Sequence, residues 1–233
     1  MAALYLLPIY LGETSSVEIF SGQETNILRR LKFFVSENEK TARKFIKFLC
    51  PEVIQNDLSF SVLDKRTTEQ EIEELSEPLK EGNDVGLISE AGLPCIADPG
   101  NLLVAWCHRN KIRVIPVNGP SSIILALIAS GLNGQNFTFN GYLPIDAIQK
   151  KKAIQNLESI SRTHGSAQIF METPYRNQSL FDDLLKYLHP STQLCVATHI
   201  TLPDESIKTL TVREWKDKKP DFHKKPTIFI LQA

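Results

Sequence analysis

Short apolar segments alternate with longer segments of helical periodicity along most of this chain, and this alternation constrains its fold more than any other feature. Residues 32–36 form one short apolar run, and the segment after it places Ala42, Phe45, Ile46 and Leu49 on one helical face. This pattern is typical of α/β proteins, whose parallel strands are covered by helices on both faces of a sheet. The sequence therefore predicts an α/β fold.

The two halves of the chain differ in how their strands are connected. In the first half a helix is expected after nearly every strand, which predicts a mostly parallel sheet. In the second half the last strands follow one another without a long helix, which predicts a mixed sheet. The apolar segment SIILALIASGL between the halves has no polar face and is expected to form a boundary helix. We therefore expect two α/β domains, residues 1–117 and 118–233, with a cleft between them.

The elements expected in these domains are short strands and helices of ordinary length. The expected strands are residues 4–9, 32–36, 84–89, 112–117, 137–140, 167–172, 194–200, 206–212 and 227–232. Helices are expected in the segments NEKTARKFIKFLC, TEQEIEELSEPLKEG and GNLLVAWCHRN of the first half, and at residues 147–162 and 177–188 of the second.

The composition argues against several classes of protein. With 26 basic and 27 acidic residues the formal net charge is −1, so the chain as a whole has no electrostatic attraction for nucleic acid or for an anionic membrane. The four cysteines and five histidines show no metal-ligand spacing, which predicts neither a zinc site nor a disulfide framework. The apolar start of the chain is broken by Pro8 and is too short to span a bilayer. We expect a cytoplasmic protein with reduced thiols and no membrane partner.

The stretch LISEAGLPCIADPG, residues 87–100, places turn residues and two carboxylates directly after an expected strand. In open α/β sheets, ligands bind at the carboxyl ends of strands, where loops lead into helices. Gly92 and Gly100 permit a close approach of the backbone, while Glu90 and Asp98 can accept hydrogen bonds from hydroxyl or ammonium groups. The alternative is that Asp98 only caps the following helix and that Glu90 is solvated.

Two further loops follow the same logic. The segment PVNGPSS turns at Gly119 and Pro120 into a helix whose first amide groups can bind a polar ligand, or are simply capped. Neither glycine loop matches GxGxxG or GxxxxGK[ST], which argues against an ordinary dinucleotide fold or a nucleoside triphosphatase. In FMETPYRNQSL a strand ends at Glu172, which can pair with Arg176 on the wall of a cleft or in a surface salt bridge of little energy.

Taken in order, these segments resemble the tetrapyrrole methylase superfamily of S-adenosylmethionine-dependent methyltransferases. VGLISEAGLPCIADPG is similar to the SDAGTPxxSDPG signature of the branch that methylates the 2′-oxygen of a cytidine in 16S ribosomal RNA. IRVIPVNGPSSIILALIASGL, NFTFNGYLP, IFMETPYR and LCVATHIT are similar to later segments of that branch. The resemblance spans most of the chain in collinear order.

The sequence also departs from that branch. The usual opening PTPIGNLxDIT is replaced by LPIYLGETSSVEI, which keeps Pro8 and Gly12. The usual EDTR is replaced by ENEK, which keeps Glu37 but has Asn38 and Lys40. The C-terminal extension of the branch has no counterpart in this sequence. Cofactor binding is therefore better supported than ribosomal RNA as the substrate.

The resemblance implies that S-adenosylmethionine binds in a cleft between the domains and that its methyl group is transferred in line, without a metal. The residues implied in cofactor binding lie in the opening motif and the two glycine loops, and they are Gly12, Glu90, Ala91, Gly92, Leu93, Pro94, Asp98, Gly119, Pro120, Ser121 and Ser122. Glu37, Glu172 and His199 lie in motifs that face the cleft in the family and are candidates for a general base. A lone histidine at a strand end is more often structural, so the sequence leaves the base unidentified.

The resemblance further implies RNA of the small ribosomal subunit as the methyl acceptor, and a homodimer as the assembly. Two basic stretches, residues 150–152 and 216–226, can contact phosphates or are solvated lysine-rich loops. Methylation of a tetrapyrrole or another small molecule is one alternative. A degenerate paralogue that binds the cofactor or the ribosome without catalysis is the alternative from a different class.

Overall fold

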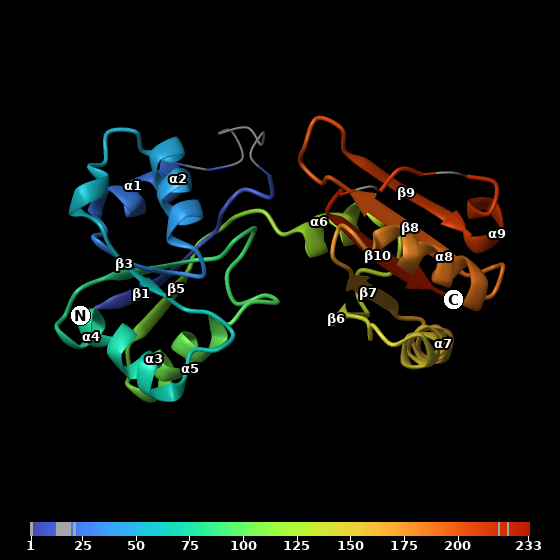
Figure 1. Ribbon diagram of the computed structural model, residues 1–233, viewed down its shortest axis with the longest axis horizontal. Coiled ribbons are helices and arrows are strands. Elements are labelled where there is room, and N and C mark those ends of the chain that lie inside the picture. Colours follow the sequence, from blue (N-terminus) through green and yellow to red (C-terminus); the bar gives the residue numbers. More distant parts are fainter. Residues whose placement is uncertain (1, 13–19, 21, 219, 223) are drawn as a thin grey trace. The chain divides into compact units, whose positions relative to one another are not determined.

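The computed structural model describes residues 2–12, 20, 22–218, 220–222 and 224–233 of the 233-residue chain. The chain divides between Ser121 and Ser122 into two compact units, Met1–Ser121 and Ser122–Ala233 (Figure 1). Each unit contains a five-stranded sheet.

The first unit is a parallel sheet covered by helices. Its strands are β1 (Ala3–Leu7), β2 (Phe33–Ser36), β3 (Ser59–Val62), β4 (Val85–Ile88) and β5 (Arg113–Pro116), and its helices are α1 (Gly22–Arg30), α2 (Glu39–Leu49), the 3₁₀ turn η2 (Gln55–Asp57), α3 (Glu69–Leu75), α4 (Glu77–Lys80) and α5 (Asn101–Arg109). The strand order is β3-β2-β4-β1-β5, and every neighbouring pair is parallel. All five carboxyl ends therefore lie at one edge of the sheet.

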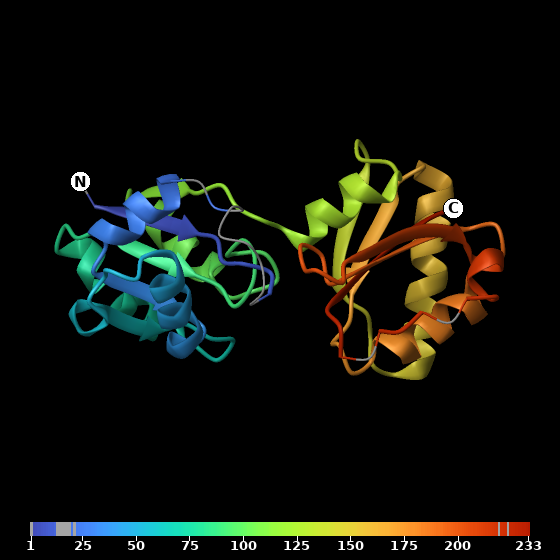
Figure 2. The ribbon, with the colours of Figure 1, turned by 90° about the horizontal axis from the view of Figure 1, so that it is seen from above.

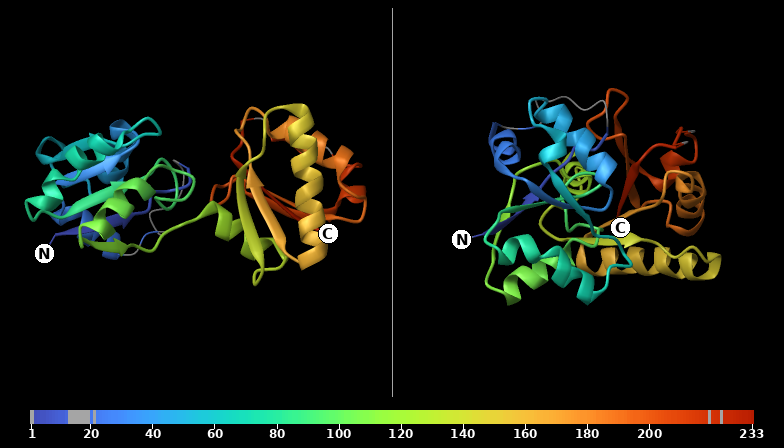
Figure 3. Two further views of the ribbon diagram at one scale, coloured as in Figure 1. Left: turned by 90° about the horizontal axis from the view of Figure 1, so that it is seen from below. Right: turned by 60° about the vertical axis from the view of Figure 1, so that its left-hand side comes forward.

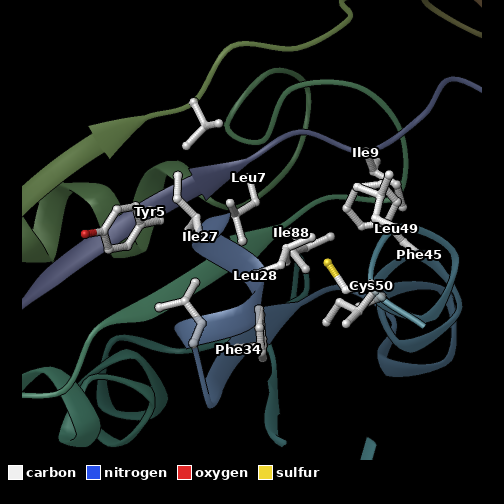
Figure 4. Close-up of a cluster of buried hydrophobic side chains, with 14 of the residues drawn as sticks. Tyr5, Leu7, Ile9, Ile27, Leu28, Phe34, Phe45, Leu49, Cys50 and Ile88 are labelled. Atoms are coloured by element: carbon white, nitrogen blue, oxygen red, sulfur yellow. The ribbon is translucent and has the colours of Figure 1, made fainter. Parts of the chain in front are cut away.

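Two hydrophobic clusters hold the first unit together, one on each face of its sheet. Side chains of α1 and α2, among them Leu28 and Phe45, pack on one face against Leu7 and Phe34 (Figure 4). On the other face, side chains of α3, α4 and α5 pack against alternate residues of β1 and β4. Because β1 is buried on both sides, its sequence is apolar at every position rather than alternating.

The second unit is built around a mixed sheet. Its strands are β6 (Phe137–Tyr142), β7 (Ala167–Met171), β8 (Gln193–Thr198), β9 (Ser206–Thr211) and β10 (Thr227–Gln232), and its helices are α6 (Ser122–Ser130), α7 (Ala147–His164), α8 (Asn177–Tyr187) and α9 (Val212–Trp215). The strand order is β6-β7-β10-β8-β9, in which β6 and β7 are parallel and the other neighbours antiparallel. Helix α6 lies on one face of this sheet, and α7 and α8 lie on the other (Figure 2, Figure 3).

The predicted fold class, with one mostly parallel and one mixed sheet, is confirmed. Several elements differ from the expectation, among them β3 and the helices α3 and α4. Strand β3 was not predicted, because it lies at the edge of its sheet and its sequence SFSV is half polar. The predicted helix TEQEIEELSEPLKEG is two helices, since Pro78 has no amide hydrogen and its ring excludes it from the interior of a continuous helix.

Candidate functional site

The carboxyl edge of the parallel sheet gathers the loops that the sequence analysis singled out. Strand β1 leads into residues 8–12, β2 into Glu37, β4 into residues 89–100, and β5 into the Gly119 turn. Since β4 and β5 both pair with β1, the loops after these three strands are neighbours. Parallel order thus brings segments that are far apart in sequence to one edge.

These loops touch through their backbones. The amide of Ile9 donates to the carbonyl oxygen of Gly92 at 2.9 Å, and the amide of Gly92 donates back to Ile9 at 3.2 Å. Gly92 has a φ of +71°, and a Cβ atom there would lie 3.2 Å from the carbonyl oxygen of Pro120. A Cβ atom at Gly119 would lie 2.1 Å from Cβ of Pro8. Glycine is therefore required at both positions for the loops to pack this closely.

Asp98 shapes the loop in which it lies. Its carboxylate accepts hydrogen bonds from the amide of Cys95, at 2.9 Å to each oxygen, and from the amide of Gly100 at 2.8 Å. Cys95 and Ala97 have φ angles of 71° and 65°, which non-glycine residues seldom adopt. The carboxylate thus holds in place a strained turn of the kind found at ligand-binding sites.

Cys95 is a free thiol that is not suited to nucleophilic chemistry. Burial, and secondarily the carboxylate of Asp98, raise the pKa of the Cys95 thiol to about 12. The thiol is therefore protonated at neutral pH, and a thiol in that state is a poor nucleophile.

A cavity of about 450 Å³ opens beside these loops. Its lining residues come from the end of β1, the first turns of α2 and the β4 loop, and they are Tyr10, Leu11, Gly12, Lys40, Thr41, Lys44 and Glu90. This volume lies within the range of small-molecule sites. Two of the predicted cofactor residues, Gly12 and Glu90, therefore share one cavity with lysines of α2.

Carboxylates gather at the same edge. Burial raises the pKa of Glu37, and the carboxylates of Asp98 and Glu90 raise it further. Lys65 acts in the opposite direction but does not cancel these effects. Glu37 and Asp98 also line one small hollow beneath the β4 loop.

In the second unit, the carboxyl ends of β6, β7 and β8 also share one edge. Met171 at the end of β7 pairs with Ile228 of β10, and Thr198 at the end of β8 pairs with Thr227. The residues that follow these strands, Glu172 and His199, therefore flank the beginning of β10. Sequence order alone does not show that these two candidates are neighbours across a single strand.

Glu172 is a buried carboxylate that forms an ion pair with the partly exposed Arg176. Its Oε1 atom accepts hydrogen bonds from Arg176 at 2.6 Å and from the amide of Thr173 at 2.7 Å, and its side chain is 3% exposed. Burial acts to raise the pKa of Glu172, but these hydrogen bonds prevail and hold it below its usual value. Nε of Arg176 is buried and has no acceptor among the described residues.

His199 has a carboxylate partner. Its Nδ1 atom lies 2.7 Å from Oδ1 of Asp204, and Nζ of Lys225 lies 3.2 Å from the other carboxylate oxygen. The hydrogen bond with His199, and then the contact with Lys225, lower the pKa of Asp204. His199 itself has a φ of 50°.

Comparison with known proteins gives the family of this chain. The sequence profile of the Tetrapyrrole (Corrin/Porphyrin) Methylases matches residues 24–216. The chain belongs to this family. The family predicted from the glycine loops is thereby confirmed.

Individual relatives are ribosomal enzymes by name. Ribosomal RNA small subunit methyltransferase I of Haemophilus influenzae is 32% identical over 177 residues, which cover 75% of this chain and 61% of that protein. The protein of the same name from Vibrio cholerae is 34% identical over 146 residues, or 63% of this chain and 49% of that protein. The protein of the same name from Buchnera aphidicola subsp. Acyrthosiphon pisum is 26% identical over 233 residues, which cover 99% of this chain and 78% of that protein. The matched segment thus spans about half to three fifths of the first two relatives.

Solved structures of the family share its fold. The methyltransferase CobJ matches with a TM-score of 0.65 at 16% identity, covering 100% of this chain and 95% of that one. The cobalt precorrin-4 methyltransferase CbiF matches with a TM-score of 0.61 at 14% identity, and the match covers 99% of this chain and 94% of that one. At these identities the likeness establishes the two-domain fold alone.

The structure unites some of the predicted site residues and separates others. Gly12, Glu37, the residues 90–94, Asp98 and the Gly119 turn all lie at the carboxyl edge of the first sheet. Ser121 is buried at the end of the first unit, and Ser122 begins α6 of the second. Glu172 and His199 belong to the edge of the second sheet.

Sequence reasoning missed several residues of these edges. Tyr10, Thr41 and Lys44 were not singled out, although helical spacing from Lys40 would have placed Lys44 on the same face of α2. Asp204 was also missed, and Lys225 was noted only as part of the basic stretch 216–226, because no motif indicates that Asp204 contacts both His199 and Lys225. Within the described part of the chain, no cluster of histidine, cysteine or carboxylate side chains could hold a metal ion, and no helix is long and apolar enough to cross a membrane.

Proposed function

We propose that this chain is an S-adenosylmethionine-dependent methyltransferase that acts on RNA of the small ribosomal subunit. The observation that carries the proposal is the backbone contact between the β1 and β4 loops, closed by the two hydrogen bonds between Ile9 and Gly92. Membership of the methylase family and the names of the relatives support the same conclusion.

The residues at this edge fit the cofactor. Gly92 and Gly119 lack the Cβ atoms that would force the loops apart, so backbone amides and carbonyls can meet a flat polar ligand. Glu90 faces the cavity beside Gly12 and can accept hydrogen bonds from ribose hydroxyls or an ammonium group. The cavity of about 450 Å³ provides the necessary space.

Bound S-adenosylmethionine supplies an electrophilic methyl group carried by a sulfonium. What the protein must add is orientation, exclusion of water and removal of a proton from the acceptor. The Asp98 carboxylate contributes to orientation because it fixes the β4 loop through the amides of Cys95 and Gly100. Glu90 contributes a binding charge, and Leu11 and Tyr10 provide apolar walls.

The RNA part of the proposal rests on the relatives and on the cavity rather than on the basic stretches. Within those stretches Lys150 pairs with Asp183 at 3.0 Å and Lys225 pairs with Asp204, so both lysines have partners inside the second unit. Lys40 and Lys44 line the cavity of the first unit, and their positive charge favours a phosphate group there. A homodimer and a cytoplasmic location are part of the same proposal.

Calorimetric titration with S-adenosylmethionine tests the cofactor site. We expect Gly92→Ala to raise the dissociation constant about tenfold or more, equivalent to ~1.4 kcal/mol, because a methyl group at this positive φ pushes against Pro120 and Leu11. Gly82→Ala is the matched control, since Gly82 has a φ of +92° and nothing lies within 4 Å of its added Cβ atom. Equal binding by both variants would overturn the proposed site.

Transfer of labelled methyl groups to small ribosomal subunits tests the activity. Subunits isolated from cells without small subunit methyltransferase I should accept one labelled methyl group per particle. Cofactor binding without transfer to these subunits or to a porphyrinogen would favour the non-catalytic paralogue. Transfer to the porphyrinogen alone would favour a small-molecule enzyme.

A further inference from the structure

The solvent face of α2 carries a stripe of lysines. Lys40, Lys44 and Lys47 are exposed and follow one another at intervals of four and three residues. Side chains at this spacing lie one above another on the same side of a helix. The opposite side of α2 is buried in the core of the first unit (Figure 4). We call these three residues the lysine stripe.

The lysine stripe leads away from the cavity of the first unit. Lys40 and Lys44 line that cavity, and Lys47 lies beyond it in the last turn of α2. The rise of the helix from Lys40 to Lys47 is about 10 Å, which is about the axial rise of three nucleotides in one strand of a duplex. The stripe is therefore long enough to meet more than one phosphate group.

The carboxylates beside the lysine stripe are paired with other cations. Glu39 accepts a hydrogen bond from Nε of Arg43 at 2.7 Å, and Glu52 accepts one from an arginine of α1 at 2.5 Å. Within the described part of the chain, Lys40 and Lys47 form no ion pair. A surplus of positive charge is thus concentrated here, although the formal net charge of the chain is −1.

The stability of α2 does not account for the lysine stripe. Lysines three and four residues apart repel one another and weaken a helix slightly. Lys40 also lies in the first turn, where the helix dipole disfavours a positive charge. An anionic ligand along this face would relieve both effects.

An exposed aromatic ring lies next to the stripe. Phe48 follows Lys44 by one helical turn and is 40% exposed, and no other aromatic residue in the described part of the first unit is exposed. Its ring is perpendicular to that of Tyr10, with 5.8 Å between the ring centroids, and Tyr10 lines the cavity. Cationic side chains beside a flat ring are typical of surfaces that bind single-stranded nucleic acid.

We propose that the lysine stripe and Phe48 bind a single-stranded segment of the methyl-accepting RNA. The lysines neutralise its phosphates, and a base stacks on Phe48. This inference rests on the proposed function of the chain. A single strand fits better than a duplex, because bases within a duplex are stacked on one another and do not reach a protein ring. Contacts to phosphates position the RNA without reading its sequence.

Fluorescence anisotropy with a labelled oligouridylate about 12 nucleotides long tests the surface. Lys47→Gln should raise the dissociation constant about threefold at low salt, and should reduce the slope of log K against log salt by about 0.7, because one phosphate contact is lost. Phe48→Leu should raise the dissociation constant about fivefold or more and leave the slope unchanged, because leucine keeps an apolar contact with Tyr10 but cannot stack on a base.

Lys111→Gln is the matched control. Lys111 is exposed, and it follows α5, which packs on the other face of the sheet from α2. This variant should change neither the dissociation constant nor the salt slope. A duplex RNA of the same length should lose affinity in Lys47→Gln but not in Phe48→Leu. Neither Lys47 nor Phe48 lines the cavity, so both α2 variants should keep the affinity for S-adenosylmethionine while their KM for small ribosomal subunits rises.

The outcomes separate this inference from the proposed function. Equal losses in Lys47→Gln and Lys111→Gln would show diffuse attraction and would overturn the inference. Unchanged RNA binding in both α2 variants, beside a wild type that methylates small subunits, would overturn the inference alone. A wild type that binds the oligouridylate through α2 but methylates no small subunit would overturn the proposed function, and the RNA-binding surface would stand.

Discussion

Glu37 illustrates at the scale of one residue how the first unit tolerates charge at its carboxyl edge. Burial disfavours the ionised form of its carboxyl group, and the carboxylates of Asp98 and Glu90 repel it. The pKa of Glu37 is therefore raised, which means that the folded chain binds a proton here more tightly than the unfolded chain does. Above the raised pKa, the ionised group lowers the free energy of unfolding.

We predict that Glu37→Gln stabilises the first unit at neutral pH. The free energy of unfolding of the wild type should fall as pH rises from the usual value of 4.5 to the raised value, and glutamine removes this loss. The gain should be less than about 1 kcal/mol, because solvent screens a partly buried carboxyl group. Thermal unfolding at pH 7.5 and below pH 4.5 measures it, and the gain should vanish at the lower pH.

Glu74→Gln provides the comparison, because Glu74 is an exposed residue of α3 whose side chain has no described hydrogen bond. It should leave the unfolding temperature nearly unchanged at both pH values. A Glu37→Gln variant that is less stable than the wild type at neutral pH would show that the carboxylate has a favourable partner instead of unfavourable neighbours.

Individual site residues could be predicted from the sequence where a turn demands them. Gly92 and Gly119 stood out because each lies in a proline-containing loop directly after an expected strand, and both are sites of close backbone contact. The pairing of His199 with Asp204 and Lys225 could not be predicted. The contact between His199 and Asp204 depends on the conformation of the turn after β8, and the contact between Lys225 and Asp204 depends on the pairing of β8 with β10.

At the scale of elements, the first turn of α2 shows how a departure from the family motif can preserve structure. Asn38 replaces the acid of the usual EDTR, and its side chain accepts hydrogen bonds from the amides of Lys40 and Thr41. Asparagine and aspartate are about equally good at this helix-capping position. The replacement therefore keeps α2 in place beside the cavity.

We predict that Asn38→Ala destabilises the first unit by about 1 kcal/mol, because two amides of the first turn lose their acceptor. Asn38→Asp should be as stable as the wild type or slightly more so, since a negative charge at a helix N-terminus is favourable. Urea unfolding followed by circular dichroism measures both changes. Equal stability of the alanine and aspartate variants would show that water caps this helix adequately.

Among the elements, buried strands were the most predictable. Strands β1, β4 and β10 lie within a residue or two of their expected ranges, because continuous apolar runs leave few alternatives. Strand β3 was missed since an edge strand needs only one partner and tolerates polar side chains. Helix α1, with the sequence GQETNILRR, was missed for a related reason, as few of its residues are apolar.

At the scale of the whole chain, each unit has its own hydrophobic core. The clusters of the first unit contain only residues from its own range, and the cluster around Phe181 and Trp215 contains only residues of the second. The sequence holds two tryptophans, and each unit has one. Trp106 is buried and donates to Glu73 at 2.6 Å, and Trp215 is buried and donates to the carbonyl oxygen of Leu194 at 2.8 Å.

We predict that the two units unfold separately, because each can bury its apolar side chains without the other. Protein labelled with 5-fluorotryptophan should show two folded fluorine resonances, and Trp215→Phe assigns the one that belongs to Trp106. In a urea titration, Asn38→Ala should lower the midpoint of the Trp106 resonance by about 0.5 M, which corresponds to ~1 kcal/mol at an ordinary denaturant slope. The midpoint of the Trp215 resonance should not move. If both midpoints fall together, the two units form one cooperative system and the prediction is wrong.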